Sequence, residues 1–150
     1  GEIQRLAAGA DSLALGPGLG THRETLDLVK RLLRDLSIPT VLDADALNAL
    51  AGEPDRLTAL SAPAVITPHP GEFCRLTGAE VGDVLKDPIG ASQNLAEAVG
   101  VTVILKGAPT GVAVPGKGAF GEPSGNGGMG TGGAGDGPGG GGPAHVLVLS

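Results

Sequence analysis

The chain has 150 residues and a net charge of −6, and glycine and proline make up half of residues 107–150. Two Phe and no Trp or Tyr leave few aromatic faces on which nucleic-acid bases could stack, and the acidic balance argues against a nucleic-acid partner. The single cysteine, Cys74, excludes an internal disulfide and a cysteine-rich zinc site, and no apolar run approaches membrane-spanning length.

Four short apolar runs divide the first part of the chain and are predicted to be buried strands. They cover Ser12–Leu15, Thr40–Leu42, Ala64–Thr67 and Val101–Leu105. Helical patterns lie between them, so we expect an α/β fold with a mostly parallel sheet, and the length fits one domain or part of one. The chain starts at Gly1 without a signal pattern or initiator Met, so we expect it to begin inside a longer protein.

Local start and stop signals place the helices. Thr21 and Glu24 have the spacing of a capping box at the start of the first helix. A short helix is expected over 46–51, and one or two helical turns over 72–77, closed by Gly78. Asp87, followed directly by a proline, has the pattern of an N-cap for the helix before the fourth strand.

The pattern changes after residue 110. Val112–Val114 and Ala119–Phe120 flank a Pro-Gly-Lys-Gly turn and are predicted to form a hairpin. We divide the chain into a domain over 1–136 and an irregular Gly/Pro-rich tail over 137–150. Because an interior glycine costs a helix about 1 kcal/mol and an interior proline about 3 kcal/mol, no regular helix is expected over 137–142.

Ligands of parallel α/β sheets bind beyond the carboxyl ends of the strands. In this chain those ends carry Gly16–Gly20 (GPGLG), Asp43–Asp45 (DAD), Thr67–Glu72 (TPHPGE) and Lys106–Thr110 (KGAPT). These polar or glycine-rich segments are therefore expected to form one rim of one site.

Two glycine motifs only partly match known phosphate-binding patterns. Gly16 and Gly18 fit the dinucleotide fingerprint, but its third glycine would fall on Thr21; Asp43 does stand where a ribose-binding acid would. A nicotinamide site, a tight strand-to-helix loop and a loop that lets a ligand approach the backbone all stay open. Residues 111–117 match most of a P-loop, but Gly118 replaces the Ser or Thr that would bind magnesium.

Single side chains allow two interpretations each. Lys106, directly after a strand, could reach an anionic ligand or simply be solvated. His69 and Glu72 could contact a polar ligand, or bind a metal if a third ligand existed, but no other His has metal-site spacing, so no protein-ligated metal is expected. Cys74 fits a small helix-face residue better than a nucleophile.

The segment 126–136, NGGMGTGGAGD, is the most specific of the chain. Consecutive glycines expose backbone N–H groups that can hold a phosphate, and the carboxylate behind them could take a proton from a hydroxyl. Charge stabilisation together with a base is what phosphoryl transfer to an alcohol needs, although a flexible linker would have a similar composition.

Taken in order, five segments resemble the ADP- or ATP-dependent NAD(P)H-hydrate dehydratase family of the ribokinase-like superfamily. They are ALGPGLG (14–20), LDADALN (42–48), TPHPGEFCRLTG (67–78), VILKGAPT (103–110) and NGGMGTGGAGD (126–136). The resemblance implies a three-layer sandwich with a mostly parallel central sheet, here incomplete at both ends. It also implies repair of NADH or NADPH hydrated at ring carbon 6: the hydroxyl is phosphorylated from ADP or ATP with magnesium, and phosphate is eliminated.

The resemblance also implies roles for particular residues. Asp136 would be the base on the substrate hydroxyl, and N–H groups near Gly132–Gly135 would bind the transferring phosphoryl. The nucleotide would contact Lys106, Gly107, Ala108, Pro109 and Thr110, and Asn126, Gly127, Gly128, Met129, Gly130, Thr131, Gly132, Gly133, Ala134 and Gly135. The hydrated cofactor would contact Gly18, His69, Pro70, Gly71, Glu72, Phe73, Cys74, Arg75 and Asp136.

The sequence departs from the family pattern behind Asp136. An apolar helix should start there and supply part of the anion hole, but Gly137–Pro143 contains only glycine and proline. Three hypotheses follow: a dehydratase fragment with an incomplete site, a ribokinase-like kinase of a small alcohol such as a thiazole or pyrimidine vitamin precursor, and a non-catalytic nucleotide-binding remnant. From the single cysteine and the composition we expect a cytoplasmic protein without nucleic-acid or membrane partners. The resemblance implies a homo-oligomer, associated with or fused to an NAD(P)H-hydrate epimerase.

Overall fold

A six-stranded sheet organises the part of the chain that the structure describes. The computed structural model describes residues 10–116, together with the backbone of a strand over 145–149. The sheet order follows the chain, with β1 to β4 parallel and β5 and β6 antiparallel to their neighbours. This confirms the predicted mostly parallel α/β fold. The strands are β1 (Leu13–Leu15), β2 (Thr40–Leu42), β3 (Ala64–Ile66), β4 (Thr102–Leu105), β5 (Thr110–Val114) and β6 (His145–Leu149).

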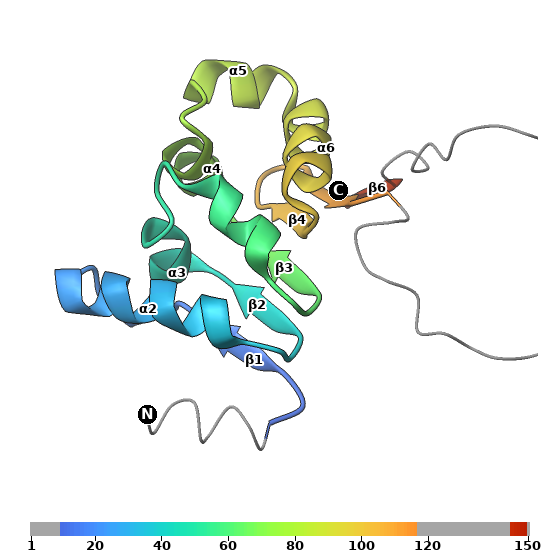
Figure 1. Ribbon diagram of the computed structural model, residues 1–150. Coiled ribbons are helices and arrows are strands. Elements are labelled where there is room, and N and C mark those ends of the chain that lie inside the picture. Colours follow the sequence, from blue (N-terminus) through green and yellow to red (C-terminus); the bar gives the residue numbers. More distant parts are fainter. Residues whose placement is uncertain (1–9, 117–144, 150) are drawn as a thin grey trace, which may run out of the picture.

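The helices lie on one side of this sheet (Figure 1). Parallel neighbours need a crossover connection, and each gap between β1 and β4 contains at least one helix. The described residues therefore form two layers, one of helices and one of strands. The helical segments are α2 (Arg23–Asp35), α3 (Ala44–Asn48), the 3-10 helix η1 (Pro54–Ala59), α4 (Pro70–Thr77), α5 (Val81–Lys86) and α6 (Pro88–Val99).

The core fills the space between the sheet and the helices. Leu42, Ile66 and Val103 are fully buried on the helix side of neighbouring strands. On the opposite side of the sheet, Val41 and Val114 are each 40% exposed. Burial therefore alternates along the strands as a half-covered sheet requires. No helix within the described ranges is long and apolar enough to cross a membrane.

The first helix begins later than its capping signal predicted. His22, and not Thr21, is the N-cap of α2, and no side chain caps this helix end. The expected Thr21–Glu24 capping box is therefore wrong. The backbone N–H of Gly20 instead donates to the Asp45 carboxylate at 2.8 Å, which holds the preceding residues in the loop. Val29, Leu32 and Leu33 form the buried face of α2.

Local signals were more reliable at α4 and α6. The Asp87 side chain accepts a hydrogen bond from the Gly90 N–H at 2.9 Å, which confirms the predicted N-cap. Gly78 ends α4 with a left-handed φ of 77°, as the sequence indicated. By contrast, α3 starts at Ala44 instead of residue 46, and the short segments η1 and α5 were not predicted, because each buries one side chain and has weak apolar periodicity.

The segments after residue 110 differ in part from the sequence prediction. β5 pairs with β4, through Val103 opposite Ala113, and with β6 on its other edge. The second arm of the predicted hairpin, Ala119–Phe120, lies outside the described residues, as does the segment 137–142. Within the expected Gly/Pro-rich tail, the structure describes 145–149 as β6, whose backbone pairs with the edge of β5.

Candidate functional site

The four predicted rim segments meet at one edge of the sheet. Strands β1 to β4 are parallel and in register, so their carboxyl ends lie side by side (Figure 1). We call this edge the rim and define it as Gly16–Gly20, Asp43–Asp45, Thr67–Glu72 and Lys106–Thr110. Hydrogen bonds between the segments confirm that the sequence correctly grouped them.

The Gly16–Gly20 loop packs against the backbone that follows β2. Gly16 has a φ of 139°, and a Cβ placed on it would lie 1.7 Å from the carbonyl oxygen of Asp43. Only glycine fits there, and its first function is this backbone contact. Gly18 is different: its φ is 78°, it is exposed, and no atom lies within 4 Å of a built Cβ. Gly18 therefore leaves open space at the rim, where a ligand can approach.

His69 and Glu72 form the cap of α4. The Nδ1 atom of His69 accepts hydrogen bonds from the N–H groups of Gly71 (3.0 Å) and Glu72 (3.3 Å). Glu72 in turn accepts the His69 backbone N–H at 2.9 Å, which completes a capping box. Because Nδ1 is an acceptor, a neutral His69 carries its proton on Nε2, which lies 3.4 Å from Glu72 Oε1. The pair thus has a structural role in addition to any contact with a ligand.

Lys106 connects three strand ends through its ammonium group. Its Nζ atom lies 2.7 Å from Asp43 Oδ1 and 3.8 Å from Glu72 Oε2. Its backbone N–H also donates to the carbonyl of Pro68 at 2.8 Å. The Glu72 side chain is 7% exposed, whereas those of Asp43 and Lys106 are 30% and 42% exposed. Lys106 is therefore a paired cation between two carboxylates at the edge of the solvent.

The ionisation of Asp43 reflects this pairing. Burial raises the pKa of Asp43, but the hydrogen bonds from Lys106 and Thr67, with the attraction of the Lys106 charge, outweigh it. The net result is a pKa below the ordinary value of an aspartic acid. Asp43 is thus an ionised partner of Lys106. The sequence had marked Asp43 only as part of the rim and as an alternative ribose-binding acid, and its position at a strand end was the available signal.

The other residues predicted to contact the hydrated cofactor divide into two groups. Pro70 and Gly71 form the first turn of α4 at the rim. Phe73 is 3% exposed and belongs to the hydrophobic core, and Cys74 packs against that core. Arg75 is exposed, and its Nε–H donates to Asn48 Oδ1 at 3.0 Å. Phe73 and Cys74 therefore pack on the core side of α4, whereas Pro70 and Gly71 lie on the rim.

The segment after Lys106 presents its backbone to solvent. Gly107, Ala108 and Pro109 are exposed, and Thr110 Oγ1 donates to the Gly107 carbonyl at 3.0 Å. This turn closes directly into β5. An exposed turn of small residues beside a paired lysine is suited to contact a ligand through its peptide groups.

The glycine-rich part of the predicted site, Asn126–Asp136, lies outside the described residues. The base assigned to Asp136 and the anion hole assigned to Gly132–Gly135 therefore stay predictions. Within 10–116, no three His, Cys, Asp or Glu side chains are grouped to hold a metal ion. Magnesium usually retains several waters and binds through substrate phosphates and one or two carboxylates, so we assign no described side chain to it.

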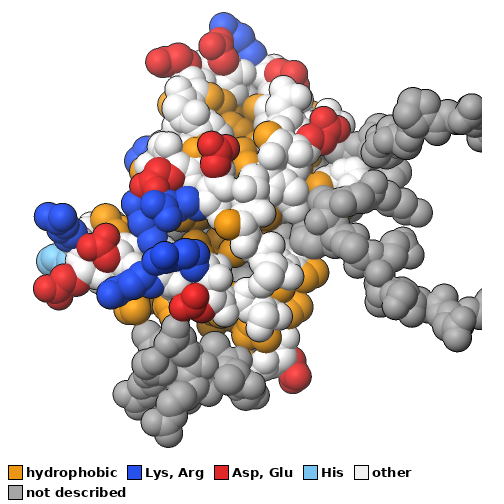
Figure 2. All heavy atoms as spheres, viewed as in Figure 1, with side chains coloured by type: hydrophobic (Ala, Val, Ile, Leu, Met, Phe, Trp, Pro, Cys, Tyr) orange, Lys and Arg blue, Asp and Glu red, His pale blue; other side chains and the backbone are white. Residues whose placement is uncertain are grey.

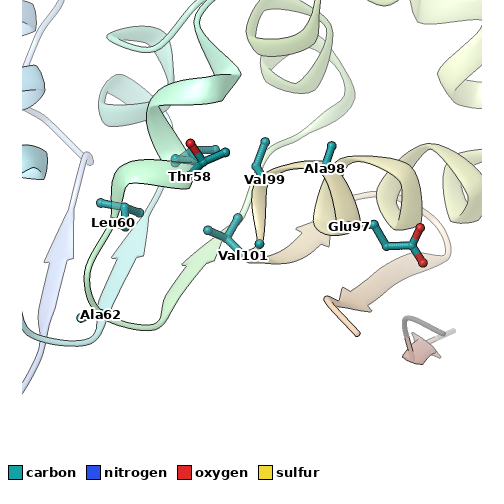
Figure 3. Close-up of a pocket in the computed structure, with 9 residues that line it drawn as sticks. Thr58, Leu60, Ala62, Glu97, Ala98, Val99 and Val101 are labelled. Atoms are coloured by element: carbon teal, nitrogen blue, oxygen red, sulfur yellow. The ribbon is translucent and has the colours of Figure 1, made fainter. Parts of the chain in front are cut away.

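A cavity of about 280 Å³ lies at the opposite end of the sheet (Figure 3). It is lined by residues of η1, the end of α6 and the segments that lead into β3 and β4, including Thr58, Ala62, Val99 and Val101. Ligands of such sheets bind at the carboxyl ends of the strands, so this cavity is on the wrong side for the predicted chemistry. Charged side chains of both signs are interspersed around α2 and near α5 (Figure 2).

Comparisons with known proteins identify relatives that match most of the chain, including the rim segments. A family model described as NAD(P)H-hydrate dehydratase matches residues 2–140. The bifunctional NAD(P)H-hydrate repair enzyme Nnr of Moorella thermoacetica is 44% identical over 127 residues, which is 85% of this chain and 24% of the relative. The Nnr enzyme of Mycobacterium tuberculosis strain H37Rv is 45% identical over 111 residues, 74% of this chain and 23% of the relative. The chain thus spans about a quarter of the length of these relatives.

Solved structures show the same likeness. The ADP/ATP-dependent NAD(P)H-hydrate dehydratase of Bacillus subtilis, co-crystallized with ATP/Mg2+, has a TM-score of 0.58 and 32% identity, over 73% of this chain and 40% of that chain. A ribokinase-like superfamily protein of Enterococcus faecalis has a TM-score of 0.61 at 23% identity, over 74% of this chain and 38% of that chain, and shows the fold alone. The family model that matches residues 2–140, together with the 44% identity to the Moorella thermoacetica enzyme, leads to one conclusion: the chain belongs to the NAD(P)H-hydrate dehydratase family.

Proposed function

We propose that the protein containing this chain returns hydrated NADH or NADPH to the intact cofactor, with ADP or ATP as phosphoryl donor. The observation that carries the proposal is the family match over residues 2–140, which includes every rim segment and Asp136. The relatives are named as NAD(P)H-hydrate repair enzymes, and the related Bacillus subtilis structure was co-crystallized with ATP/Mg2+.

The proposed reaction has two steps. The oxygen of the hydroxyl on ring carbon 6 attacks the terminal phosphoryl of the nucleotide while its proton passes to Asp136, and AMP or ADP leaves. The carbon–oxygen bond then breaks, phosphate takes the electron pair, and loss of a proton from the neighbouring carbon restores the ring double bond. Phosphorylation is useful because hydroxide is a poor leaving group and phosphate a good one. Magnesium on the nucleotide phosphates would offset the charge that develops during transfer.

The two sides of the rim receive separate roles in this proposal. We place the hydrated cofactor at Gly18, at His69–Arg75 and at Asp136, and the nucleotide at Lys106–Thr110 and at 126–135. The open space at Gly18 and the exposed peptide groups of 107–109 support these placements. Phe73 is buried in the core, so it would act by holding α4 in place.

The larger protein context is also a proposal. The relatives are bifunctional and much longer than this chain, so we propose that the dehydratase domain acts in one protein with a second activity on the same metabolite. The free thiol of Cys74 fits a reducing compartment such as the cytoplasm, and we keep the expectation of a homo-oligomer.

The test is recovery of NADH from purified hydrated NADH, followed by absorbance, with ADP or ATP and magnesium. We expect turnover with the wild-type protein and a loss of about 10³-fold in Asp136→Ala, because a positioned base contributes on that order. Undiminished turnover in Asp136→Ala would show that the base is another group. Phosphorylation of thiazole or pyrimidine alcohols without action on hydrated NADH would favour a small-alcohol kinase. ADP binding without turnover of any of these substrates would indicate a nucleotide-binding remnant.

A further inference from the structure

The three residues after β2 contact both sides of the rim. Asp45 Oδ2 accepts the backbone N–H of Gly20, 25 residues earlier in the chain. Asp43 Oδ1 accepts from the ammonium of Lys106, 63 residues later. In the sheet, β2 lies next to β1 and is separated from β4 by β3. One short segment therefore reaches back to the Gly16–Gly20 loop and forward across β3 to the Lys106–Thr110 turn.

The backbone between the two aspartates is strained. Ala44 has a φ of 46°, in the left-handed region that a residue with a Cβ seldom adopts. Such a conformation is unfavourable for a residue with a Cβ and persists only where surrounding contacts enforce it. Those contacts are present: the Asp43 N–H donates to the Leu15 carbonyl at 3.0 Å, and Gly16 packs against the Asp43 carbonyl. The fold retains an unfavourable residue where its neighbours bond to two different rim segments.

The charge of Lys106 is already paired in this arrangement. Its ammonium lies between Asp43 and the more distant Glu72 carboxylate, so its place relative to the following turn depends on Asp43. A lysine side chain has several rotatable bonds, and a short charge-assisted hydrogen bond restricts them. Asp43 is therefore suited to fix the cation before a nucleotide arrives, and Asp45 is suited to fix the Gly16–Gly20 loop.

We propose that Asp43 and Asp45 are positioning residues, one for each side of the reaction. Asp43 sets Lys106 and the adjoining turn for the nucleotide, and Asp45 sets the Gly16–Gly20 loop for the hydrated cofactor. The assignment of ligands to the two sides rests on the proposed function. Neither aspartate needs to touch a reacting atom, and each acts through the group to which it is hydrogen-bonded.

The test compares Asp43→Ala and Asp45→Ala in the wild-type protein background. We measure KM for ADP and for hydrated NADH separately, and the affinities for ADP and NADH by calorimetry. Asp43→Ala is expected to weaken ADP binding about tenfold and leave KM for hydrated NADH unchanged, because a hydrogen bond to a charged group is lost. Asp45→Ala is expected to give the reverse pattern. Asp45→Asn should restore the wild-type values, because its amide oxygen can still accept the Gly20 N–H.

The matched control is Asp83→Ala, which removes an exposed aspartate 3.1 Å from Lys86 and should leave both KM values unchanged. Thermal unfolding of each variant shows whether it remains folded. Equal rises of both KM values in both variants would reduce the aspartates to a structural role and overturn the proposal. Tighter ADP binding in Asp43→Ala would also overturn it, since Asp43 would then only mask the Lys106 charge.

The failure of the proposed function can be told apart from the failure of this inference. If the wild-type protein does not restore NADH, the proposed function fails, and the calorimetric affinities alone decide the positioning roles. If the wild-type protein is active but the two variants do not separate the ligands, the proposed function stands and the positioning inference fails.

Discussion

The two ends of the parallel strands carry different kinds of residues. At the carboxyl ends, four segments distant in sequence are joined by Asp43, Asp45, Glu72 and Lys106, and Ala44 has a positive φ although it carries a Cβ. At the amino ends, largely apolar residues of η1, α6 and the strand entries surround a cavity of about 280 Å³ (Figure 3). The ion pairs of the rim and the strained Ala44 therefore lie at the carboxyl ends, whereas apolar side chains predominate at the amino ends.

This difference shows how one sheet separates chemistry from stability. Parallel strands place all their carboxyl ends on one edge, so residues from several connections can converge there. At the opposite edge the connections enter the strands, and side chains of the core can fill the space there. We therefore expect substitutions at the rim to change ligand binding as well as local geometry and stability, and substitutions at the amino ends to change stability alone.

The largest effect is expected for Gly16→Ala. The new Cβ would lie 1.7 Å from the Asp43 carbonyl oxygen, at a φ of 139°, so the loop and the segment after β2 must separate. We expect the free energy of unfolding to fall by about 3 kcal/mol, measured by urea denaturation. Gly18→Ala is the control, because its φ is also positive but its Cβ would meet no atom within 4 Å. Equal losses in both variants would contradict the role of the close contact.

A smaller effect, confined to stability, is expected for Val101→Ala at the amino end of β4. Val101 is 2% exposed and lines the amino-end cavity, so truncation removes apolar contacts and enlarges a void. The free energy of unfolding should fall by about 2 kcal/mol, as measured by urea denaturation. KM values for ADP and hydrated NADH should stay at their wild-type values. A change in either KM would show that the two ends of the sheet are coupled.

The smallest effect is expected from the charge of Asp43 and depends on pH. Its lowered pKa means that ionised Asp43 stabilises the folded state above the unfolded-state value of about 3.9, and that this contribution is lost as the pH falls through the lower folded-state pKa. Because the pair is partly exposed, Asp43→Asn should lower the free energy of unfolding by less than about 1 kcal/mol at neutral pH. The difference from wild type should disappear in acid. A difference that persists once the pH is below the folded-state pKa of Asp43, in urea denaturation followed over pH, would contradict the ion pair as its cause.

The sequence predicted those elements whose signals are local. The four apolar runs became β1 to β4, and the Asp87 N-cap and the Gly78 stop were confirmed, since each depends on a few neighbouring residues. The capping box at Thr21 was wrong because a contact 25 residues away holds Gly20 in the loop. The strand at 145–149 was missed because its stability depends on the open edge of β5.

For the candidate site, the sequence by itself determined that the four rim segments follow parallel strands and so share one edge of the sheet. Only the tertiary structure decided which groups pair within the rim. His69 and Glu72 were seen as possible ligands, but the fold uses them to cap α4; Asp43 and Lys106, 63 residues apart, form an ion pair that no local pattern encodes. The reason is physical: capping and turn preferences act over a few residues, whereas an ion pair requires the sheet to bring distant strand ends together.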